Sequence, residues 1–266
     1  SLKDSLNVLS YNSNLTIPKE DISEVETTQD NPSVVPKTTD EQKDTSQSKD
    51  DGKNNKAENS DKKTEEKSED KKVKSTGKRV YIYDTHQDES YKGGKTVLDA
   101  AAILAQKLED RGIKVVLETN DFIRYRDTHG LTYNESYVVS YKYLNEALVN
   151  YGGFDMCLDL HRDSIPREAS YINIDGKNYA KGMFVVGGLG KNAKTATKLS
   201  TTLTDTINAK KNGIMKGVMT REAYYNQEVA KNIVLMELGG DVNTFEEVSN
   251  SLDVIADGIH DVLTKE

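Results

Sequence analysis

The stretch Arg79-Val-Tyr-Ile-Tyr-Asp84, the segment from Thr96 to Arg111 and the stretch Ile113-Lys-Val-Val-Leu117 together decide the expected fold. β-Branched and aromatic residues predict a buried strand for the first and third of these. The middle segment is expected to be a helix, because its apolar residues recur at helical spacing and Gly112 suits its end. Two strands joined through a helix pair in parallel with a right-handed crossover.

The alternation of strands and helices continues to the end of the chain. Polar residues dominate Thr119 to Tyr133, where no regular element is expected. Thr244 and Glu247 form a capping box for the last helix. The pattern predicts a three-layer α/β domain with a mostly parallel central sheet and helices on both faces. Its further elements are expected as strands at Met156–Leu160, Gly182–Gly187 and Ile233–Leu238, a hairpin at Tyr171–Ala180, and helices at Asn134–Tyr151, Ala193–Lys210 and Phe245–Val262.

The first 78 residues have a different composition from the rest. The run from Asp40 to Lys74 is low in complexity and mixes both charge signs. Such a segment buries too little apolar surface to order itself, so we expect a disordered tether over residues 1–78 and a folded catalytic domain over residues 79–266. A coil of this length spans roughly 45–50 Å. The chain opens at Ser1 rather than Met, so a removed membrane anchor is expected before it.

Composition excludes several classes of protein. The formal net charge is −8, which argues against nucleic acid as the main partner. The one cysteine, Cys157, rules out a disulfide framework. No apolar stretch reaches the roughly 20 residues that span a bilayer.

Four residues that bind metals or move protons lie at or just beyond predicted strands. His86 and Glu89 follow the first strand, His161 follows the strand at Met156–Leu160, and Glu237 lies near the end of the strand at Ile233–Leu238. In open α/β sheets, ligands bind beyond the carboxyl ends of the strands. We therefore expect these side chains to converge on one edge of the sheet.

This set suits a hydrolytic zinc site. His86, Glu89 and His161 would be three protein ligands, the number typical of catalytic zinc, and Glu237 would be the general base. Bound zinc lowers the pKa of its water to about 7 and polarises a carbonyl. Taken singly, a histidine just after a strand is also typical of a hydrogen-bonded loop residue. Glu237 taken singly is also typical of a buried carboxylate paired with an arginine. The other histidines, His129 and His260, are interpreted as solvated or cap residues, and Cys157 as a buried strand residue rather than a nucleophile.

The motifs around these residues resemble the stage II sporulation protein P family of zinc-dependent N-acetylmuramoyl-L-alanine amidases. The resemblance covers essentially all of Arg79 to Glu266, with the motifs in the family's order. They are Tyr83-Asp-Thr-His-Gln-Asp-Glu-Ser-Tyr91, Leu158-Asp-Leu-His-Arg-Asp-Ser164, Met183-Phe-Val-Val-Gly187, Tyr225-Asn-Gln227 and Met236-Glu-Leu-Gly-Gly-Asp-Val-Asn-Thr244.

The resemblance implies a peptidoglycan hydrolase that cuts the amide between muramic acid and L-alanine, and also stem-peptide cross-links. It implies action beside the lytic transglycosylase stage II sporulation protein D during engulfment of the forespore. It further implies membrane anchoring outside the cytoplasm, in the space between the mother-cell and forespore membranes. His86, His161 and Glu237 fall on the family's functional positions. Glu89 falls on the Glu-Ser-Tyr piece, and its role is exchangeable with that of Glu237.

One position departs from the resembled pattern. The family often has a second histidine where this chain has Asp84, which could orient a ligand imidazole instead. Arg162 and Asp163 are candidates for positioning the carbonyl or His161, and Arg221 for meeting an acidic stem peptide. The polar segments Thr119–Tyr133 and Pro166–Lys181 are the expected walls of an open groove.

Two rival functions remain open. A zinc carboxypeptidase also uses His-x-x-Glu with a distant histidine, but needs a cation for the terminal carboxylate. A non-catalytic wall-binding scaffold would recruit a partner hydrolase and hold no zinc.

Overall fold

The computed structural model describes residues 73–265 of the chain, and nearly all of the predicted tether lies outside them. The predicted boundary at residues 78/79 stays a prediction, although the first strand does begin at Arg79. The central sheet has six strands in the order β2 (Lys114–Leu117), β1 (Arg79–Tyr83), β3 (Met156–Asp163), β8 (Ile233–Gly240), β6 (Gly182–Gly187) and β7 (Met215–Arg221).

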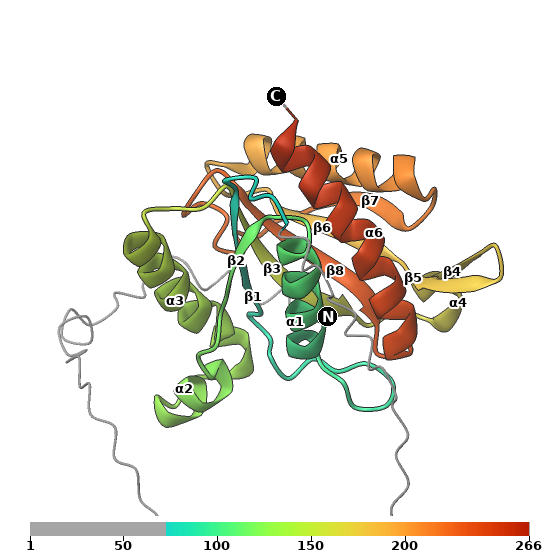
Figure 1. The fold of residues 1–266 in the computed structure, drawn as a ribbon. Helices are drawn as coiled ribbons and strands as arrows, with labels where there is room; N and C mark the ends of the chain where they lie inside the picture. The colour runs from blue at the N-terminus through green and yellow to red at the C-terminus, as the bar shows by residue number, and fades with distance from the viewer. Residues whose placement is uncertain (1–72, 266) are drawn as a thin grey trace, which may run out of the picture. The chain divides into compact units, whose positions relative to one another are not determined.

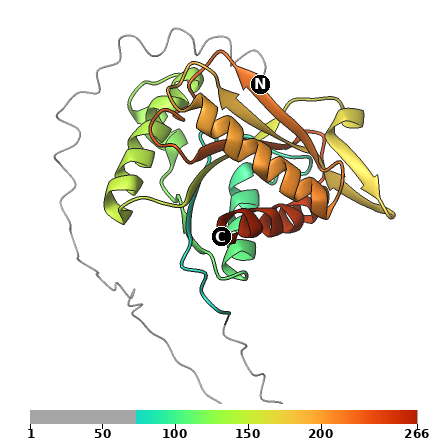
Figure 2. The ribbon, with the colours of Figure 1, turned by 90° about the horizontal axis from the view of Figure 1, so that it is seen from above.

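Neighbouring strands of this sheet are parallel, apart from the antiparallel pair β6 and β8. Helices cover both of its faces (Figures 1 and 2). One face packs against α1 (Val97–Glu109), α5 (Ala193–Lys210) and α6 (Phe245–Thr264). The other packs against α2 (Phe122–Thr128) and α3 (Ser136–Tyr151). The prediction of a three-layer, mostly parallel α/β domain is confirmed.

Several shorter elements connect the long helices and strands along the chain. The predicted hairpin is present as β4 (Tyr171–Ile174) and β5 (Lys177–Ala180), and it follows the short helix α4 (Arg167–Ser170). A 3-10 turn, η3 (Tyr133–Glu135), leads directly into α3. Asp175 has a positive φ of 53° at the hairpin turn, where Asp is one of the few residues that tolerate it.

The alternation of side chains along β3 positions the site. Leu158 and Leu160 belong to the core on the α1 face, whereas Cys157 belongs to the core on the α3 face. Because successive strand residues point to opposite faces, Asp159 and His161 share the α3 face with Cys157. His161 accordingly packs beside Tyr137 of α3.

Two elements differ from the sequence prediction. The segment from Thr119 to Tyr133 contains α2, which Phe122 anchors by burying its ring and Asp121 caps by accepting a 2.8 Å hydrogen bond from the Arg124 amide. The edge strand β7 was not predicted, because Lys216, Gly217 and Thr220 interrupt its apolar residues and leave no continuous apolar run. Strands β3 and β8 also run two or three residues further than expected, which brings His161 and Asp163 into the sheet.

The predicted capping box of α6 is present and is reinforced from outside the helix. Glu247 is 4% exposed and accepts hydrogen bonds from Asn243 Nδ2 at 2.9 Å and from Arg167 Nη1 at 2.7 Å. Burial alone would raise the pKa of Glu247, but the hydrogen bonds from Arg167, Asn243 and Thr244 outweigh it and lower the pKa below the usual value of a glutamate.

We expect Glu247→Gln to lower the free energy of unfolding by about 1–2 kcal/mol at pH 7, because it removes charge-assisted hydrogen bonds. A carboxyl with a depressed pKa in the folded state stabilises the protein above its unfolded pKa, and this contribution is lost as pH falls through the folded pKa. The difference in the free energy of unfolding between the parent protein and Glu247→Gln should therefore shrink below about pH 4. Urea denaturation across pH measures this, with the exposed Glu246→Gln as control. An unchanged difference at pH 3 would contradict the ionic origin.

Among the helices of residues 73–265, none is both long and apolar enough to cross a bilayer.

Candidate metal centre

The loop after β1 carries two of the predicted ligands. Asp159 of β3 fixes the start of this loop, because it accepts bonds from the Thr85 amide at 2.9 Å and the Thr85 hydroxyl at 2.6 Å. The Glu89 amide then bonds to the His86 carbonyl at 3.1 Å, which closes a turn. This turn is what allows a His-x-x-Glu spacing to direct both side chains at one point.

The third predicted ligand enters from β3. His86, Glu89 and His161 are all buried, and each offers a ligand atom within 4.8 Å of the other two. Glu89 lies between the histidines, with its Oε1 3.6 Å from His86 Nδ1 and its Oε2 3.4 Å from His161 Nδ1. The structure thus brings together the three residues that the sequence nominated as ligands.

Glu89 is held in its ionised form. Burial alone would raise its pKa, but His161 and His86 outweigh this and lower it well below the usual value of a glutamate. The backbone amide of Arg162 also donates a 2.9 Å hydrogen bond to Glu89 Oε2. A carboxylate fixed in this way is ready to bind a cation.

His161 has a carboxylate on each side. Its Nε2 lies 3.0 Å from Asp159 Oδ1, although the pair lacks the angle of a directed hydrogen bond. Burial alone would lower the pKa of His161, but Asp159 and Glu89 raise it well above its usual value. A carboxylate at the far nitrogen of a ligand histidine orients the ring and makes it a better ligand.

The sequence nominated Asp84 rather than Asp159 for orienting a ligand imidazole. Tyr83 pairs with Asp159 in the β1–β3 register, so Asp84 follows with the opposite parity. The Oδ1 atom of Asp84 is buried and has no hydrogen-bond partner among the described residues. Burial, followed by the charge of Asp159, raises the pKa of Asp84 well above its usual value. The period-two spacing of Leu158-Asp-Leu-His161 was the signal that could have identified Asp159.

Aromatic rings from the α3 side enclose the two imidazoles. Tyr133 stacks on His86 at a centroid distance of 4.4 Å, and Tyr137 meets the edge of the same ring at 5.5 Å. Tyr137 also lies parallel to the His161 ring at 6.4 Å. These rings limit the rotamers of both histidines.

Glu237 lies beside the three clustered residues. It is directly opposite His161 in the register of β3 and β8. Its Oε2 atom is buried and has no hydrogen-bond partner among the described residues. Burial raises the pKa of Glu237 to about 7; His161 opposes this rise, while Glu89 and Asp163 add to it.

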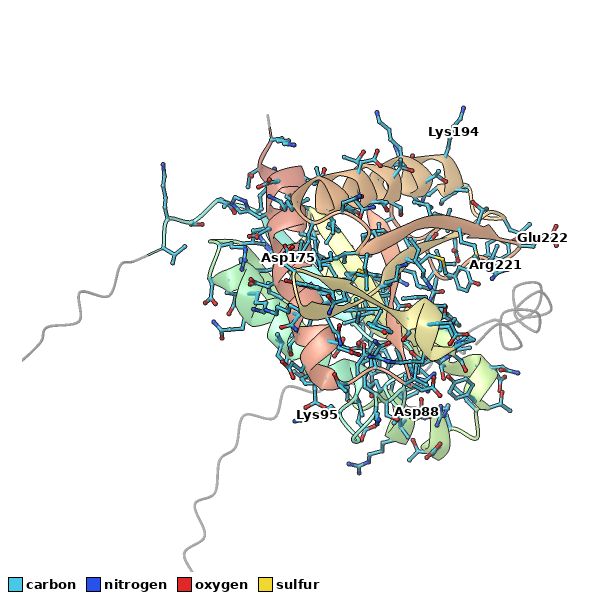
Figure 3. The ribbon with its side chains drawn as sticks, turned by 90° about the vertical axis from the view of Figure 1, so that its right-hand side faces the viewer. Asp88, Lys95, Asp175, Lys194, Arg221 and Glu222 are labelled. Atoms are coloured by element: carbon cyan, nitrogen blue, oxygen red, sulfur yellow. The ribbon has the colours of Figure 1, made fainter. Side chains whose placement is uncertain are left out.

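Other nominated residues have different surroundings. The Arg162 side chain donates to the Ser90 carbonyl at 3.0 Å, and Asp163 lies 3.9 Å from Lys216 Nζ. Arg221, at the end of β7, lies well apart from Asp88 of the loop that carries His86 and Glu89 (Figure 3).

The remaining histidines and the cysteine lie outside the cluster. His129 is exposed and bonds to the Tyr125 carbonyl, and His260 contacts Asp261. Burial raises the pKa of the Cys157 thiol to about 12, which agrees with its interpretation as an unreactive strand residue.

The donor set fits a zinc ion. Two imidazole nitrogens and one carboxylate leave a coordination position open, as catalytic zinc requires. His86, Glu89 and His161 are buried, and the histidines favour the ionised form of Glu89. The Oε2 atom of Glu237 has no hydrogen-bond partner within residues 73–265. The cluster can therefore hold a metal, and Glu237 lies opposite His161 in the register of the neighbouring strand.

Comparison with known proteins supplies independent findings. The model of the family "Stage II sporulation protein P (SpoIIP)" matches residues 2–260. Stage II sporulation protein P of Bacillus subtilis (strain 168) is 30% identical over 206 residues, which are 70% of this chain and 51% of that protein. The chain thus spans about half the length of this curated relative.

Two solved amidase structures are also among those similar to this chain. One is N-acetylmuramoyl-L-alanine amidase AmiC2 of Nostoc punctiforme, with 15% identity, a TM-score of 0.47, and coverage of 72% of this chain and 99% of that one. The other is the CwlD amidase from Clostridioides difficile in complex with the GerS lipoprotein, with 17% identity, a TM-score of 0.47, and coverage of 69% and 95%.

Proposed function

Because the chain belongs to the stage II sporulation protein P family, we propose that it is a zinc-dependent peptidoglycan hydrolase that cleaves the N-acetylmuramoyl-L-alanine amide bond. One observation carries this proposal. Ligand atoms of His86, Glu89 and His161 converge within 4.8 Å in a buried site, with Glu237 opposite His161. A wall-binding scaffold has no need for such a site.

The proposed roles follow from the contacts of each residue. His86, Glu89 and His161 would hold the ion, which supplies Lewis-acid polarisation of the scissile carbonyl and a lower pKa for water. Glu237 would accept a proton from the attacking water and deliver it to the leaving amine. A pKa of about 7 suits a group that must take up and release a proton near neutral pH.

The geometry favours one division of labour between the two glutamates. Glu89 contacts both histidines and accepts the Arg162 amide, so it is already ionised and fixed. Glu237 has a raised pKa and an oxygen without a hydrogen-bond partner in the described part of the chain. We therefore assign Glu89 as the ligand and Glu237 as the base.

The contact between Asp159 and His161 leads to a prediction about affinity. We expect Asp159→Asn to weaken zinc binding about 10–100-fold, because the imidazole loses the carboxylate that orients it. Competition with a chromophoric chelator measures the affinity. Asp155→Asn is the matched control, because Asp155 precedes the same strand but bonds to the Arg79 amide instead. Equal affinities for the two variants would contradict the role of Asp159.

Mass spectrometry of fragments released from defined peptidoglycan tests the bond that is cut. An amidase releases free stem peptides with an L-alanine amino terminus. Cleavage of cross-linked stems alone would identify an endopeptidase, and loss of a terminal residue alone a carboxypeptidase. The last also needs a cation near the site, whereas the Arg162 side chain is engaged with Ser90.

The setting of this activity is part of the proposal. Family membership supports a role in sporulation, with cell-wall peptidoglycan as the substrate. We further propose membrane anchoring, action in the space between mother cell and forespore, and cooperation with stage II sporulation protein D. Fractionation and affinity purification from sporulating cells test these three points.

A further inference from the structure

A second cavity opens at the same edge of the sheet as the candidate metal centre. Its volume is about 450 Å³, within the usual range of small-ligand sites. The β1–α1 loop, α1, the end of β2 and the start of α2 line this cavity. In Figure 1 the end of β2 runs down between α1 and α2. Its walls include three aliphatic and three acidic side chains, namely Leu98, Leu117, Ile123, Asp84, Glu118 and Asp121.

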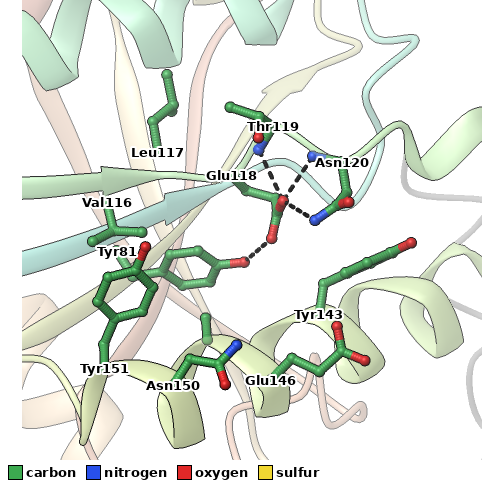
Figure 4. A pocket seen from close by; sticks show the side chains of 11 residues that line it. Tyr81, Val116, Leu117, Glu118, Thr119, Asn120, Tyr143, Glu146, Asn150 and Tyr151 are labelled. Atoms are coloured by element: carbon green, nitrogen blue, oxygen red, sulfur yellow. Dashed lines mark hydrogen bonds between the residues drawn. The ribbon is translucent and has the colours of Figure 1, made fainter. Parts of the chain in front are cut away.

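Most polar groups of this cavity already have partners. Figure 4 draws a neighbouring pocket that shares Glu118 with this cavity. Glu118 accepts hydrogen bonds from the Tyr81 hydroxyl, the Thr119 amide and both nitrogens of Asn120. Asp121 caps α2. Gln87 donates to the Asn120 carbonyl and accepts from the Phe122 amide.

Asp84 is the exception. It is only 1% exposed, it lines the cavity, and its Oδ1 has no hydrogen-bond partner among the described residues. A buried polar atom without a partner is costly, so native proteins rarely keep one unless a ligand or an ordered solvent molecule satisfies it. Asp84 thus offers one open acceptor at an aliphatic wall.

These features define the chemistry of the ligand. Aliphatic walls suit a methylene chain, and an acceptor oxygen within an acidic lining suits a positively charged donor at its tip. A divalent cation would require several free oxygens, whereas the other carboxylates here are bonded to protein donors. We propose that this cavity, the Asp84 pocket, binds a primary ammonium group at the end of an aliphatic side chain.

This inference rests on the proposed function, because a lysine-type residue of the stem peptide supplies such a group. Asp84 and His86 are two residues apart, so their Cα atoms are at most about 7 Å apart. A stem residue two positions beyond the scissile amide lies at a similar distance of roughly 7 Å from it. The Asp84 pocket would therefore select the stem peptide by its amine while the amide lies at the metal centre.

Binding without turnover tests the pocket. The full 266-residue chain, loaded with zinc, is titrated with Nα-acetyl-lysine methylamide while NMR follows the methyl groups of Leu98, Leu117 and Ile123. The norleucine analogue has the same chain with a methyl group in place of the amine. We expect saturable shifts of these methyl groups with the lysine probe and at least about 10-fold weaker binding of the norleucine probe.

Matched variants locate the interaction. Asp84→Asn should weaken binding of the lysine probe about 10-fold, since the Asn amide keeps an acceptor oxygen but cannot carry the negative charge that a bound ammonium stabilises. Asp88→Asn, in the same loop but outside the pocket, should leave it unchanged; the Asp88 side chain is 40% exposed. Equal binding of the two probes, as expected if a water or buffer ion satisfies Asp84, would overturn the proposal without any variant.

The outcomes separate this proposal from that of the hydrolase. Release of stem peptides with no preference for the lysine probe would overturn the Asp84 pocket alone. Specific lysine binding by a protein that hydrolyses no muropeptide would overturn the proposed function alone.

Discussion

Replacing Glu237 with Gln is expected to slow hydrolysis of the muramoyl amide by about 10²–10⁴-fold, the usual contribution of a general base. The reason is that the amide of Gln can neither accept a proton from water nor pass one to the leaving amine. Zinc content should remain one per chain, because Glu237 is not among the three clustered residues. Muropeptide release and metal analysis on the same preparation measure both properties.

Glu228→Gln is the matched control for this experiment. Glu228 also has a raised pKa and a buried oxygen without a partner among the described residues, but it lies outside the cluster. It should release muropeptides at the parent rate. If Glu237→Gln were equally active, the base assignment would be wrong. If it also lost zinc, Glu237 would be a ligand and its role would be exchanged with that of Glu89.

Replacing His161 with Ala is expected to remove both zinc and activity. His161 supplies one of only two imidazoles in the cluster, and its Nδ1 faces Glu89 at 3.4 Å. Two ligands are too few for a catalytic zinc site, so we expect the affinity for zinc to fall by at least 100-fold. This loss exceeds the one expected for Asp159→Asn, which removes only a residue that orients a ligand. Metal analysis after dialysis and muropeptide release measure the two effects.

His129→Ala controls for the loss of a histidine as such. His129 is exposed and bonds to the Tyr125 carbonyl, so its removal should leave both zinc content and activity unchanged. Thermal unfolding of each variant checks that the fold persists. A folded His161→Ala protein that keeps one zinc per chain would show that the metal binds elsewhere.

The sequence was sufficient to predict the architecture and the meeting of three residues from distant segments. Short apolar runs identified β1, β3 and β8, and the rule that parallel strands end at one edge then placed His86, Glu89 and His161 together. The carboxyl-end rule alone could not rank Asp84 against Asp159. The period-two spacing of Asp159 and His161 on one strand already places them on one face, and the pairing of Tyr83 with Asp159 shows that Asp84 points to the other.

The missed elements have physical explanations of the same kind. Helix α2 occurs in a polar segment because one buried ring, that of Phe122, and one capping carboxylate, that of Asp121, suffice for a short surface helix. Strand β7 pairs only with β6 at the sheet edge, so its sequence does not need the apolar run of a central strand. The Asp84 pocket combines residues from four elements, and no local pattern in the sequence encodes it.

Anomalous diffraction at the zinc absorption edge, from crystals of the zinc-loaded protein, locates the metal directly. We expect one peak within about 2.0–2.2 Å of a nitrogen of His86, a nitrogen of His161 and a carboxylate oxygen of Glu89. Glu237 should lie next to this peak without bonding to it. A peak bound to other residues, or no peak at this cluster in zinc-saturated crystals, would show that these three residues are not the zinc ligands.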